Sequence, residues 1–277
     1  MIIMEKQSIE EMLSPQSKRA LMEIQLFDDI DSTNAEAIRQ IQAGNTENRL
    51  LLASSQFAGK GRRGRQWLSP EGAGIYLSLA RQFSLEPNQL QGLSLLTAIS
   101  LKSALNQLGV SALKLKWPND VLSGKKKLAG ILLELQQSGG HCFVVFGVGI
   151  NVALPAEVVE ELDRPVTDIT SITGMAVDRN AVVAAFVNEL SNNLEEYEEN
   201  GFSSFKQSWN ESDYYLNSDI VIQNGETRII GKSLGVDQDG ALLLQTATGT
   251  QTINGGEVFP SLREISDEAR APLNNGI

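Results

Sequence analysis

The sequence predicts an α+β protein, with a mixed β-sheet and packed helices in a large first domain and a small β-barrel after it. Short apolar runs of strand character alternate with amphipathic helical patterns through most of the chain. After Leu216 the pattern changes to several short strands, separated by the hairpin turn signals Asn224-Gly225 and Asp239-Gly240. We therefore expect a lead at 1–24, a main domain at 25–214, a small domain at 215–266 and a polar tail at 267–277.

Composition limits the class of protein and the kind of site. The 277 residues carry 34 acidic and 23 basic side chains, a formal net charge of −11, and 42% hydrophobic residues, as is ordinary for a globular protein. Cys142 is the only cysteine and His141 the only histidine, which excludes an intramolecular disulfide and a histidine-rich metal cluster. The chain shows neither a signal-peptide pattern nor an apolar run of membrane-spanning length, so we expect a cytoplasmic protein without membrane contact.

The amino-terminal part of the chain reads as a short helical lead from Met1 to Leu26, interrupted at Pro15. It is too short for a helix-turn-helix domain with its own core, so we expect no DNA-binding module ahead of the main domain. Thr33 and Glu36 have the spacing of a capping box, which predicts a short helix that ends near Gly44.

Apolar runs then predict the strands of the main domain, and helical spacing predicts the segments between them. The expected strands are Leu50–Ser54, Gly74–Ala80, Leu113–Trp117, Leu128–Glu134 and Cys142–Asn151. The expected helices are Leu90–Gly109, a long helix between Asp178 and Gly201, and Phe202–Tyr215, with an irregular loop at Ala153–Gly174. The small domain is expected to contain Asp219–Gln223, Arg228–Leu234, Ala241–Gln245 and Thr250–Ile253, closed by Glu257–Arg263.

The stretch Gly59 to Trp67 joins two of the predicted strands and reads Gly-Lys-Gly-Arg-Arg-Gly-Arg-Gln-Trp. Glycine lets a ligand approach the main chain closely, and successive N–H groups in such a loop can bind an anion. Arg62, Arg63 and Arg65 add planar donors that suit phosphate or carboxylate. A solvated basic turn and a nucleic-acid patch are the alternatives. Because the whole protein is acidic, this cationic island favours a small anion over a long polyanion.

Polar residues stand at the ends of two other predicted elements. Ser32 and Thr33 either only cap the following helix or also place hydroxyl and N–H groups at one end of a pocket. Asn119 and Asp120 follow a predicted strand and offer oxygen ligands for Mg²⁺, although an ordinary Asx turn would look the same.

Lysines and glycines mark the next two strands. Lys127 leads directly into an apolar strand, so its ammonium group can reach inward, whereas Lys125 and Lys126 are expected to face water. Gly147 and Gly149 lie inside a predicted strand, which indicates that a ligand or backbone approaches closely.

Five stretches form an ordered set that is more specific than any one of them. They are Ser32-Thr33-Asn34, Gln56 with the Gly59–Trp67 loop, Lys116-Trp117-Pro118-Asn119-Asp120, Lys127-Leu128-Ala129-Gly130-Ile131 and Gly147-Val148-Gly149-Ile150-Asn151. In this order they resemble the biotin protein ligases, and the carboxyl-terminal strands look like the SH3-like domain of that family. The resemblance covers roughly residues 25 to 263 and implies that the main domain has the biotin/lipoate ligase fold and is the catalytic domain.

The resemblance implies a reaction in two steps. Biotin and MgATP give biotinyl-5'-AMP and pyrophosphate, and a lysine of a biotin carboxyl carrier protein then takes the biotinyl group and releases AMP. The implied cofactors are biotin, ATP and Mg²⁺. The form implied is the one without an amino-terminal DNA-binding domain, so no nucleic-acid partner is expected, and the protein is expected to be a monomer or a homodimer.

The resemblance also implies roles for individual residues. The implied catalytic residues are Arg62, Lys127 and Asp120, with Asp120 also a metal ligand. The implied biotin contacts are Ser32, Thr33, Asn34, Gln56, Lys60, Gly61, Arg62, Lys127 and Gly130. The implied ATP and adenylate contacts are Arg63, Arg65, Trp67, Asn119 and Asn151. These residue types suit the chemistry. The ureido ring of biotin needs neutral hydrogen-bond donors and acceptors, and the biotin carboxylate and the α-phosphate of ATP repel each other unless cations lie between them.

This chain departs from the family pattern at two places. Lys60 stands where the family usually has arginine, and Phe259-Pro260 interrupts the closing motif, which leaves the roles of Glu257 and Arg263 open. Three rival functions are a lipoate ligase, which would need a long apolar tunnel, a sensor that binds biotin or nucleotide without catalysis, and a nucleic-acid-binding module. The polar residues Ser32, Thr33 and Gln56, the pair Arg62 and Lys127, and the acidic composition favour the biotin ligase.

Overall fold

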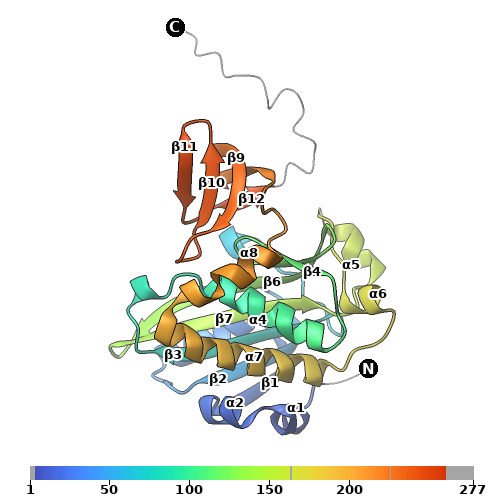
Figure 1. Ribbon diagram of the computed structural model, residues 1–277. Coiled ribbons are helices and arrows are strands. Elements are labelled where there is room, and N and C mark those ends of the chain that lie inside the picture. Colours follow the sequence, from blue (N-terminus) through green and yellow to red (C-terminus); the bar gives the residue numbers. More distant parts are fainter. Residues whose placement is uncertain (1–3, 163, 225, 260–277) are drawn as a thin grey trace.

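The computed structural model describes residues 4–162, 164–224 and 226–259. Its larger part is a seven-stranded sheet with the order β1-β2-β3-β7-β6-β5-β4 (Figure 1). The strands are β1 (Glu23–Ile30), β2 (Arg49–Gln56), β3 (Gly74–Phe83), β4 (Leu113–Lys116), β5 (Asp120–Ser123), β6 (Lys126–Ser138) and β7 (His141–Asn151). β1 runs parallel to β2 and the other neighbouring strands are antiparallel, so the predicted mixed sheet is confirmed.

Helices cover both faces of the sheet. The α-helices are α1 (Lys6–Met12), α2 (Pro15–Ala20), α3 (Thr33–Gln42), α4 (Leu93–Gln107), α5 (Ala156–Glu161), α6 (Ile169–Thr173), α7 (Arg179–Asn200) and α8 (Lys206–Ser212). Short 3₁₀ turns are η1 (Arg62–Gly64), η2 (Pro87–Gln89) and η3 (Phe202–Phe205). α4 and α7 pack together over one face, with α1 and α2 beside α7 (Figure 1). α3 packs on the other face, against β2, β3, β6 and β7. No helix of the described residues could cross a membrane by length and apolarity.

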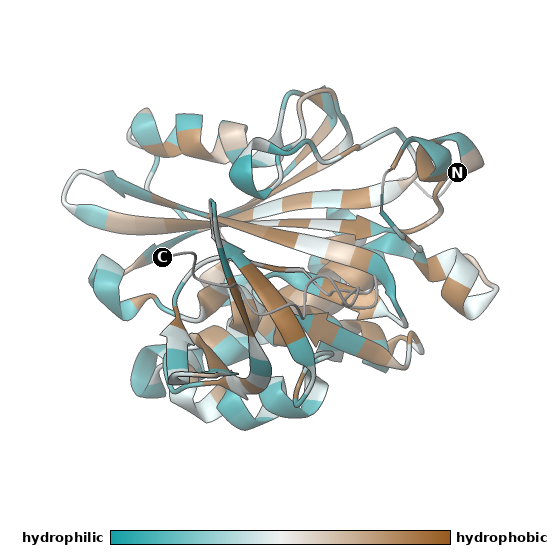
Figure 2. Ribbon diagram, turned by 90° about the horizontal axis from the view of Figure 1, so that it is seen from above, coloured by the Kyte–Doolittle hydropathy of each residue, from teal (hydrophilic) through white to brown (hydrophobic). Residues whose placement is uncertain are grey.

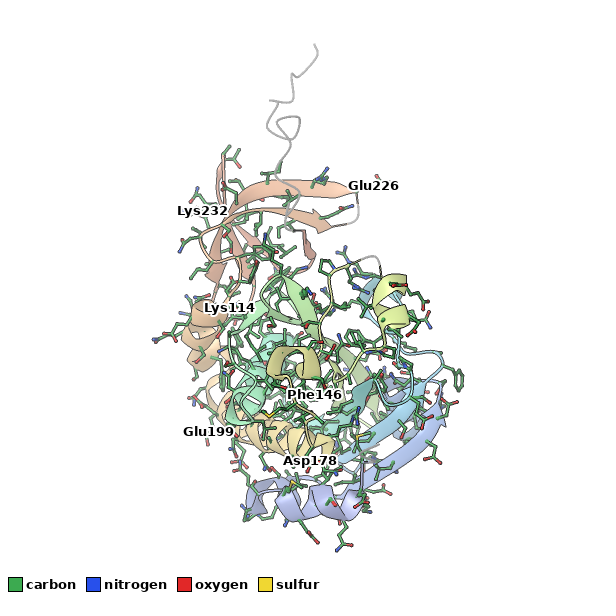
Figure 3. All side chains as sticks on the ribbon, turned by 90° about the vertical axis from the view of Figure 1, so that its right-hand side faces the viewer. Lys114, Phe146, Asp178, Glu199, Glu226 and Lys232 are labelled. Atoms are coloured by element: carbon green, nitrogen blue, oxygen red, sulfur yellow. The ribbon has the colours of Figure 1, made fainter. Side chains whose placement is uncertain are left out.

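Strand alternation decides which residues enter which core. Leu50 and Leu52 join the main core with α4 and α7, whereas Leu51 packs in a second cluster with Ala37 and Ile41 of α3. Apolar residues follow the strands and the helix sides that face them, and polar residues lie on turns and outer surfaces (Figure 2). In the side view, Phe146 lies inside, while the charged residues labelled there are exposed at the surface (Figure 3). Both faces of the central strands are therefore buried, which leaves the strand ends and glycine-rich positions for a site.

A small antiparallel domain follows, and it shares the main core. Its strands have the order β11-β10-β9-β8-β12 and are β8 (Asp219–Asn224), β9 (Thr227–Val236), β10 (Leu242–Thr246), β11 (Gly249–Ile253) and β12 (Glu257–Phe259). Ile220 and Leu242 belong to the same cluster of buried residues as the seven-stranded sheet. Trp117 Nε1 donates a 3.1 Å hydrogen bond to Gly240 O, and a Cβ atom at Gly240 would lie 3.0 Å from Gly92 Cα. The small domain thus packs directly against the start of α4.

Most of the predicted elements are present, and three local predictions were wrong. β1 begins at Glu23, inside the predicted helical lead, and it was missed because this edge strand buries fully only Ile24. The N-cap of α3 is Ser32 instead of Thr33, since Ser32 has extended backbone angles and its side chain accepts from Ala35 N. The segment predicted as irregular contains the short helices α5 and α6. Arg263, the 267–277 tail and Gly225 lie outside the described residues.

The junction between the two domains contains a buried carboxyl group. Asp213 is 7% exposed, and its Oδ1 accepts a 2.9 Å hydrogen bond from Tyr215 N. Its Oδ2 has no hydrogen-bond partner within the part of the chain that the structure describes. Burial raises the pKa of Asp213 from 3.8 to about 6, although the hydrogen bond from Tyr215 and the charge of Lys114 act in the opposite direction. The folded protein therefore keeps a proton between pH 4 and 6 that the unfolded chain has lost.

Asp213→Asn is expected to remove this pH dependence. Below pH 4 the wild-type carboxyl is neutral in both states, and above pH 6 the folded state alone carries a buried charge. From pH 4 to pH 8, the unfolding free energy of the variant should therefore increase relative to that of the wild type by on the order of 3 kcal/mol. Urea unfolding at both pH values measures this, and a difference independent of pH would contradict it.

Candidate functional site

A cleft of about 770 Å³ lies between the large sheet, the glycine loop and the small domain. Thirteen of the residues singled out from the sequence line it, and they come from segments far apart in the chain. They are Ser32, Thr33, Asn34, Gln56, Lys60, Gly61, Arg62, Arg65, Trp67, Asn119, Asp120, Lys127 and Gly130. The fold therefore gathers one set of polar and cationic side chains in a single concave site.

A neutral hydrogen-bonding network forms one end of the cleft. Gln56 Oε1 accepts hydrogen bonds from Thr33 N (2.9 Å) and Thr33 Oγ1 (3.2 Å), and Gln56 Nε2 donates to Ser69 Oγ (2.9 Å). The buried hydroxyl of Ser78 bonds to Thr33 Oγ1 and to Asn34 Oδ1. These contacts fix the side chains at the start of α3 by joining them to β2 and β3, so this end is rigid and uncharged.

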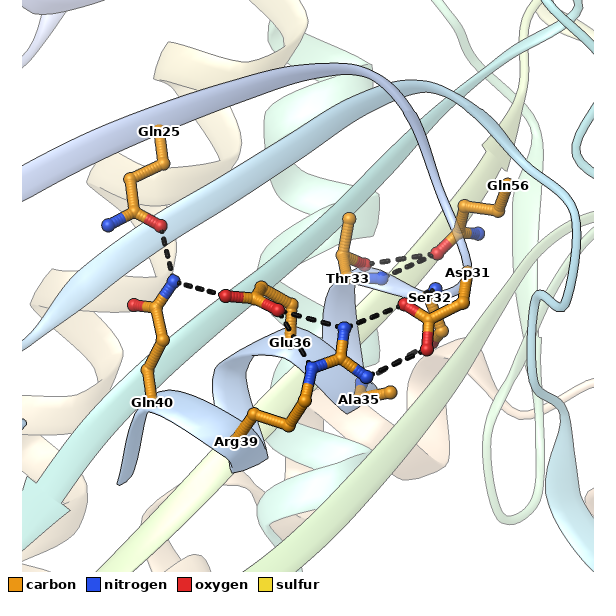
Figure 4. A network of polar contacts seen from close by, with 9 residues as sticks. All are labelled: Gln25, Asp31, Ser32, Thr33, Ala35, Glu36, Arg39, Gln40 and Gln56. Atoms are coloured by element: carbon orange, nitrogen blue, oxygen red, sulfur yellow. Dashed lines mark hydrogen bonds and ion pairs between the residues drawn. The ribbon is translucent and has the colours of Figure 1, made fainter. Parts of the chain in front are cut away.

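An ion pair outside the cleft holds the same turn (Figure 4). Arg39 makes a bidentate pair with Asp31, at 2.7 and 2.8 Å, and Asp31 Oδ1 accepts from Ser32 N at 2.7 Å. The Arg39 hydrogen bonds lower the pKa of Asp31 to about 2, although burial acts against them. Ala58 N donates to Asp31 O at 2.9 Å. Asp31 therefore links the start of α3 to the beginning of the glycine loop.

The glycine loop forms a closed turn between β2 and β3. Lys60 and Gln66 form an isolated antiparallel bridge, Gly61 N donates to Arg65 O at 2.7 Å, and Trp67 N donates to Gly59 O at 2.9 Å. A Cβ atom at Gly59 would lie 2.4 Å from Trp67 O, so only glycine fits where the two sides of the turn meet.

Arg62 joins the loop to two other parts of the cleft. Its Nη1 donates to Asn119 Oδ1 at 3.3 Å, and its Nη2 donates to Gly256 O of the small domain at 3.4 Å. Asn119 is held in turn, because its Nδ2 donates to Ile131 O at 2.8 Å. The guanidinium group therefore lies where the loop, the β4–β5 turn and the small domain meet.

Lys127 reaches the cleft because β6 contains a bulge. The pairing of β5 with β6 shifts between Val121, which faces Ala129, and Leu122, which faces Lys127. The extra residue, Leu128, is fully buried, and Lys127 comes onto the same face of the sheet as Asp120 and Gly130. Without the bulge, period-two alternation would turn the lysine toward the opposite face.

Asp120 is the partner of Lys127 within the cleft. Asp120 Oδ1 lies 2.6 Å from Lys127 Nζ, and Asp120 Oδ2 lies 3.9 Å from Lys116 Nζ. Burial alone would raise the pKa of Asp120, but the charges of Lys127, Lys116 and Arg164 outweigh it and hold that pKa below its usual value. Asp120 is therefore charged at neutral pH and holds Lys127 in place.

Trp67 lies on a floor of glycine residues. Lys127 Nζ is 5.2 Å from the centre of the Trp67 ring, within the range of a cation–π contact. A Cβ atom at Gly149 would lie 2.4 Å from Trp67, and one at Gly130 would lie 2.8 Å from it. Gly147 leaves the same kind of space for Asn34, at 2.3 Å. The close approach expected at the strand glycines is thus made by side chains of this chain.

Two of the residues singled out from the sequence do not line this cleft. Asn151 is buried, and its Nδ2 donates to Thr167 O (3.0 Å) and Lys127 O (3.4 Å), so its amide group joins two segments of main chain. Arg63 is exposed on the other side of the loop, in a left-handed conformation (φ 57°), with Nη2 donating to Gln223 O at 3.4 Å. Neither residue is among those that line the cleft, and their contact with the nucleotide stays a prediction.

The prediction that Asp120 ligates a metal stays a prediction. Its carboxylate already pairs with two lysines, and a cation there would compete with both. Among the described residues, no group of three or more His, Cys, Asp or Glu side chains is placed to hold a metal ion.

The cleft also contains residues that sequence patterns did not indicate. Arg164 follows α5, Tyr215 follows α8, and Gln223 and Arg228 lie on paired positions of β8 and β9. No local motif marks them. Gln223 and Arg228 reach the cleft only after the small domain packs on the large one, and Arg164 does so because main-chain hydrogen bonds join its segment to β6.

The site is thus a polar pocket with converging cations, on a mixed sheet with an appended small β domain. Residues 26–151 match the Biotin/lipoate A/B protein ligase family, and residues 215–259 match the Biotin protein ligase C terminal domain. The bifunctional ligase/repressor BirA of Escherichia coli is 36% identical over 237 residues, which cover 83% of this chain and 71% of that protein. The biotin–[acetyl-CoA-carboxylase] ligase of Paracoccus denitrificans is 36% identical over 236 residues, 83% of this chain and 97% of that one.

Solved structures agree with this. Biotin protein ligase from Aquifex aeolicus in complex with biotin and ATP matches with a TM-score of 0.73 and 32% identity, over 86% of this chain and 98% of that chain. The chain belongs to the biotin protein ligase family, and it is a ligase. The family resemblance and the α+β fold with a small carboxyl-terminal β domain are thereby confirmed.

Gly149→Ala is expected to displace Trp67 from the glycine floor. The new methyl group would overlap the indole, and the resulting strain should lower the unfolding free energy by about 1–3 kcal/mol. Gly255→Ala is the matched control, because no atom lies within 4 Å of a Cβ there. Chemical denaturation compares the two, and equal stability of both variants would argue against a packed Trp67.

Proposed function

We propose that this protein is an ATP-dependent biotin protein ligase that forms biotinyl-5'-AMP and transfers biotin to a lysine of a biotin carboxyl carrier protein. The observation that carries the proposal is the single cleft in which Arg62 and Lys127 stand beside the neutral network of Ser32 and Gln56. Similarity to proteins named as biotin–[acetyl-CoA-carboxylase] ligases supports both the reaction and the class of acceptor.

The neutral end of the cleft suits the ureido ring of biotin. The ring presents two N–H donors and one carbonyl acceptor, and Ser32, Thr33 and Gln56 offer hydroxyl, amide and main-chain groups. Because Ser78 and Asn34 hold these groups in place, little side-chain entropy is lost on binding. The absence of charge at this end matches a neutral ring, and the fixed geometry would exclude a flexible acyl chain.

The cationic part of the cleft addresses the repulsion between the reactants. The biotin carboxylate must approach the α-phosphate of ATP, and both groups are negative. Arg62 can bind both groups with its planar donors, and Lys127 can stabilise the negative charge that develops on the α-phosphate. Asp120 holds the ammonium group of Lys127 in the cleft, so it is already oriented when the reactants arrive.

The remaining residues suit the nucleotide. Trp67 offers an aromatic surface, Asn119 an amide, and Arg65 a further cation at the loop. The acyl-adenylate is a mixed anhydride, so water must be kept from it until the acceptor lysine attacks. The glycine loop and the small domain, both in contact with Arg62, can form that cover.

The metal that the reaction requires would arrive with the nucleotide. Because the described residues hold no acidic cluster, we assign Mg²⁺ to the phosphates of ATP, which it neutralises in part. The low pKa of Asp120 makes it a poor base for the acceptor lysine. We therefore assign Asp120 the role of positioning Lys127 in both steps. Since the reaction consumes ATP, we place it in the cytoplasm, and the protein acts as a monomer or a homodimer.

Lys127→Ala should abolish most adenylation while leaving biotin binding. Loss of one cation at the reacting centre should cost roughly 3 kcal/mol in the transition state, a factor on the order of a hundred in rate. The measurement is pyrophosphate release, followed by transfer of labelled biotin to a purified carrier domain. Lys126→Ala is the control, because Lys126 precedes Lys127 in β6 and is exposed. If the wild-type protein binds biotin and ATP but transfers no label, the enzyme assignment is wrong.

The glycine loop is expected to become less accessible when the adenylate forms. Arg62, Arg63 and Arg65 are cleavage sites for trypsin, and cover of the adenylate should protect them several-fold. Limited proteolysis with and without biotin and ATP measures this. Equal cleavage rates in both conditions would show that the loop does not close.

A further inference from the structure

A buried network behind the neutral end of the cleft fixes the direction of hydrogen bonds there, in addition to the positions of the side chains. It starts at Asn34, which is buried and whose Nδ2 donates to Leu132 O at 3.2 Å and to Glu134 Oε2 at 2.8 Å. A carbonyl oxygen and a carboxylate oxygen can only accept, so the amide nitrogen must face them and Asn34 Oδ1 must face the other way. Gly147 leaves the space for this amide, since a Cβ atom there would lie 2.3 Å from Asn34 Oδ1.

Ser78 is the next member of this network. It is fully buried on β3 and is not among the residues that line the cleft. Its Oγ lies 2.5 Å from Asn34 Oδ1 and 2.7 Å from Thr33 Oγ1. A hydroxyl group has one hydrogen, and an amide oxygen only accepts, so the hydrogen of Ser78 goes to Asn34. The hydrogen between Ser78 and Thr33 must therefore come from Thr33.

Thr33 has a second possible acceptor, which the distances make the weaker one. Its Oγ1 also lies 3.2 Å from Gln56 Oε1, an oxygen that already accepts from Thr33 N at 2.9 Å (Figure 4). If the hydrogen of Thr33 pointed to Gln56, two hydroxyl oxygens 2.7 Å apart would face each other with no hydrogen between them. The shorter contact therefore takes the hydrogen, and Thr33 Oγ1 has only lone pairs left for a ligand.

The position of Ser78 in the sheet makes this direction hard to reverse. Ser78 pairs with Gly147 across β3 and β7, so its main chain is held on both sides by the middle of the sheet. A threonine hydroxyl without such a partner could rotate and offer its hydrogen to an oxygen or its lone pairs to an N–H group. Here the buried network removes that choice.

We propose that Ser78 and Asn34 are positioning residues that hold Thr33 Oγ1 as a hydrogen-bond acceptor, so that the cleft selects a ring with an N–H group at that point. This proposal rests on the proposed function, because it concerns the cyclic urea of biotin. A cyclic carbamate, in which a ring oxygen replaces that N–H group, would place its lone pairs against those of Thr33. The site would then keep a buried acceptor without a donor, which penalises the wrong ligand strongly.

The test measures dissociation constants by calorimetry, without ATP, for biotin and for two carbamate analogues. In each analogue one of the two ureido N–H groups is replaced by a ring oxygen. The analogue altered at Thr33 should bind the wild-type protein at least about a hundredfold more weakly than biotin does. In Ser78→Ala the hydroxyl of Thr33 can rotate, so this ratio should fall about tenfold, while the ratio for the other analogue is unchanged.

Asn34→Ala is a second variant with the same expected direction. It removes the acceptor that takes the hydrogen of Ser78, so Ser78 can donate to Thr33, and the hydrogen of Thr33 is released. The ratio for the same analogue should fall again. This variant carries the comparison if Ser78→Ala does not fold.

Ser100→Ala is the matched control. Ser100 is also fully buried, and its hydroxyl donates to Leu96 O at 2.9 Å within α4, which packs on the opposite face of the sheet from α3. It should leave both ratios at their wild-type values. If Ser78 has only a structural role, Ser78→Ala will weaken biotin and both analogues by one common factor, and this result would overturn the proposal.

Two further results would also overturn it. One is a wild-type protein that binds biotin and both analogues equally well, and the other is a pair of ratios in Ser78→Ala equal to those of the wild type. Pyrophosphate release from biotin and ATP is measured beside the binding. Selective binding of biotin without pyrophosphate release contradicts the ligase assignment alone, whereas pyrophosphate release with unselective binding contradicts the role of Ser78 and Asn34 alone.

Discussion

The ion pair between Lys127 and Asp120 is the contact on which the site depends. An ammonium group that is mostly removed from water needs a close counter-charge, and Asp120 provides one at 2.6 Å. The pair exists only because the bulge in β6 brings Lys127 to the face on which Asp120 of β5 already lies. Asn151 and Thr167 then bind the carbonyl group of Lys127, so the main chain on either side of the bulge is fixed as well.

The glycines of β6 and β7 satisfy a second constraint. Strands in the middle of this sheet bury one face against α4 and α7, and α3 covers part of the other face, so the site forms on the remainder of that face. Gly130 pairs directly with Gly149, and together they leave a shallow floor on which the Trp67 ring rests. Any larger side chain at either position would fill this space. The floor therefore explains why strands of high apolar content tolerate glycine, which weakens a strand by itself.

The sequence predicted which residue types form the site better than it predicted where each of them lies. The glycine loop, the turn at Asn119 and the lysine before an apolar strand are local patterns, and the sheet brings them into one cleft. The hydrogen bonds of Asn151 to carbonyl groups could not be foreseen, because an amide at a strand end looks the same in the sequence whether it meets a ligand or a carbonyl group. β1 was missed since an edge strand with one buried face position carries little alternation. Arg228 could not be indicated at all, because its place depends on how the small domain packs.

The packing of the small domain therefore matters for the site as much as for stability. Its core is continuous with that of the large domain, and Trp117 donates to Gly240 across the junction. Trp117 immediately precedes the turn that carries Asn119, and Arg62 bonds to both Asn119 and Gly256. A shift of the small domain would thus change the hydrogen bonds of Arg62 and the position of the β4–β5 turn together. Because these hydrogen bonds link the glycine loop, the β4–β5 turn and the small domain to one another, the three parts act as one unit around the reactants. A mutation in the junction can therefore alter catalysis without contacting a substrate.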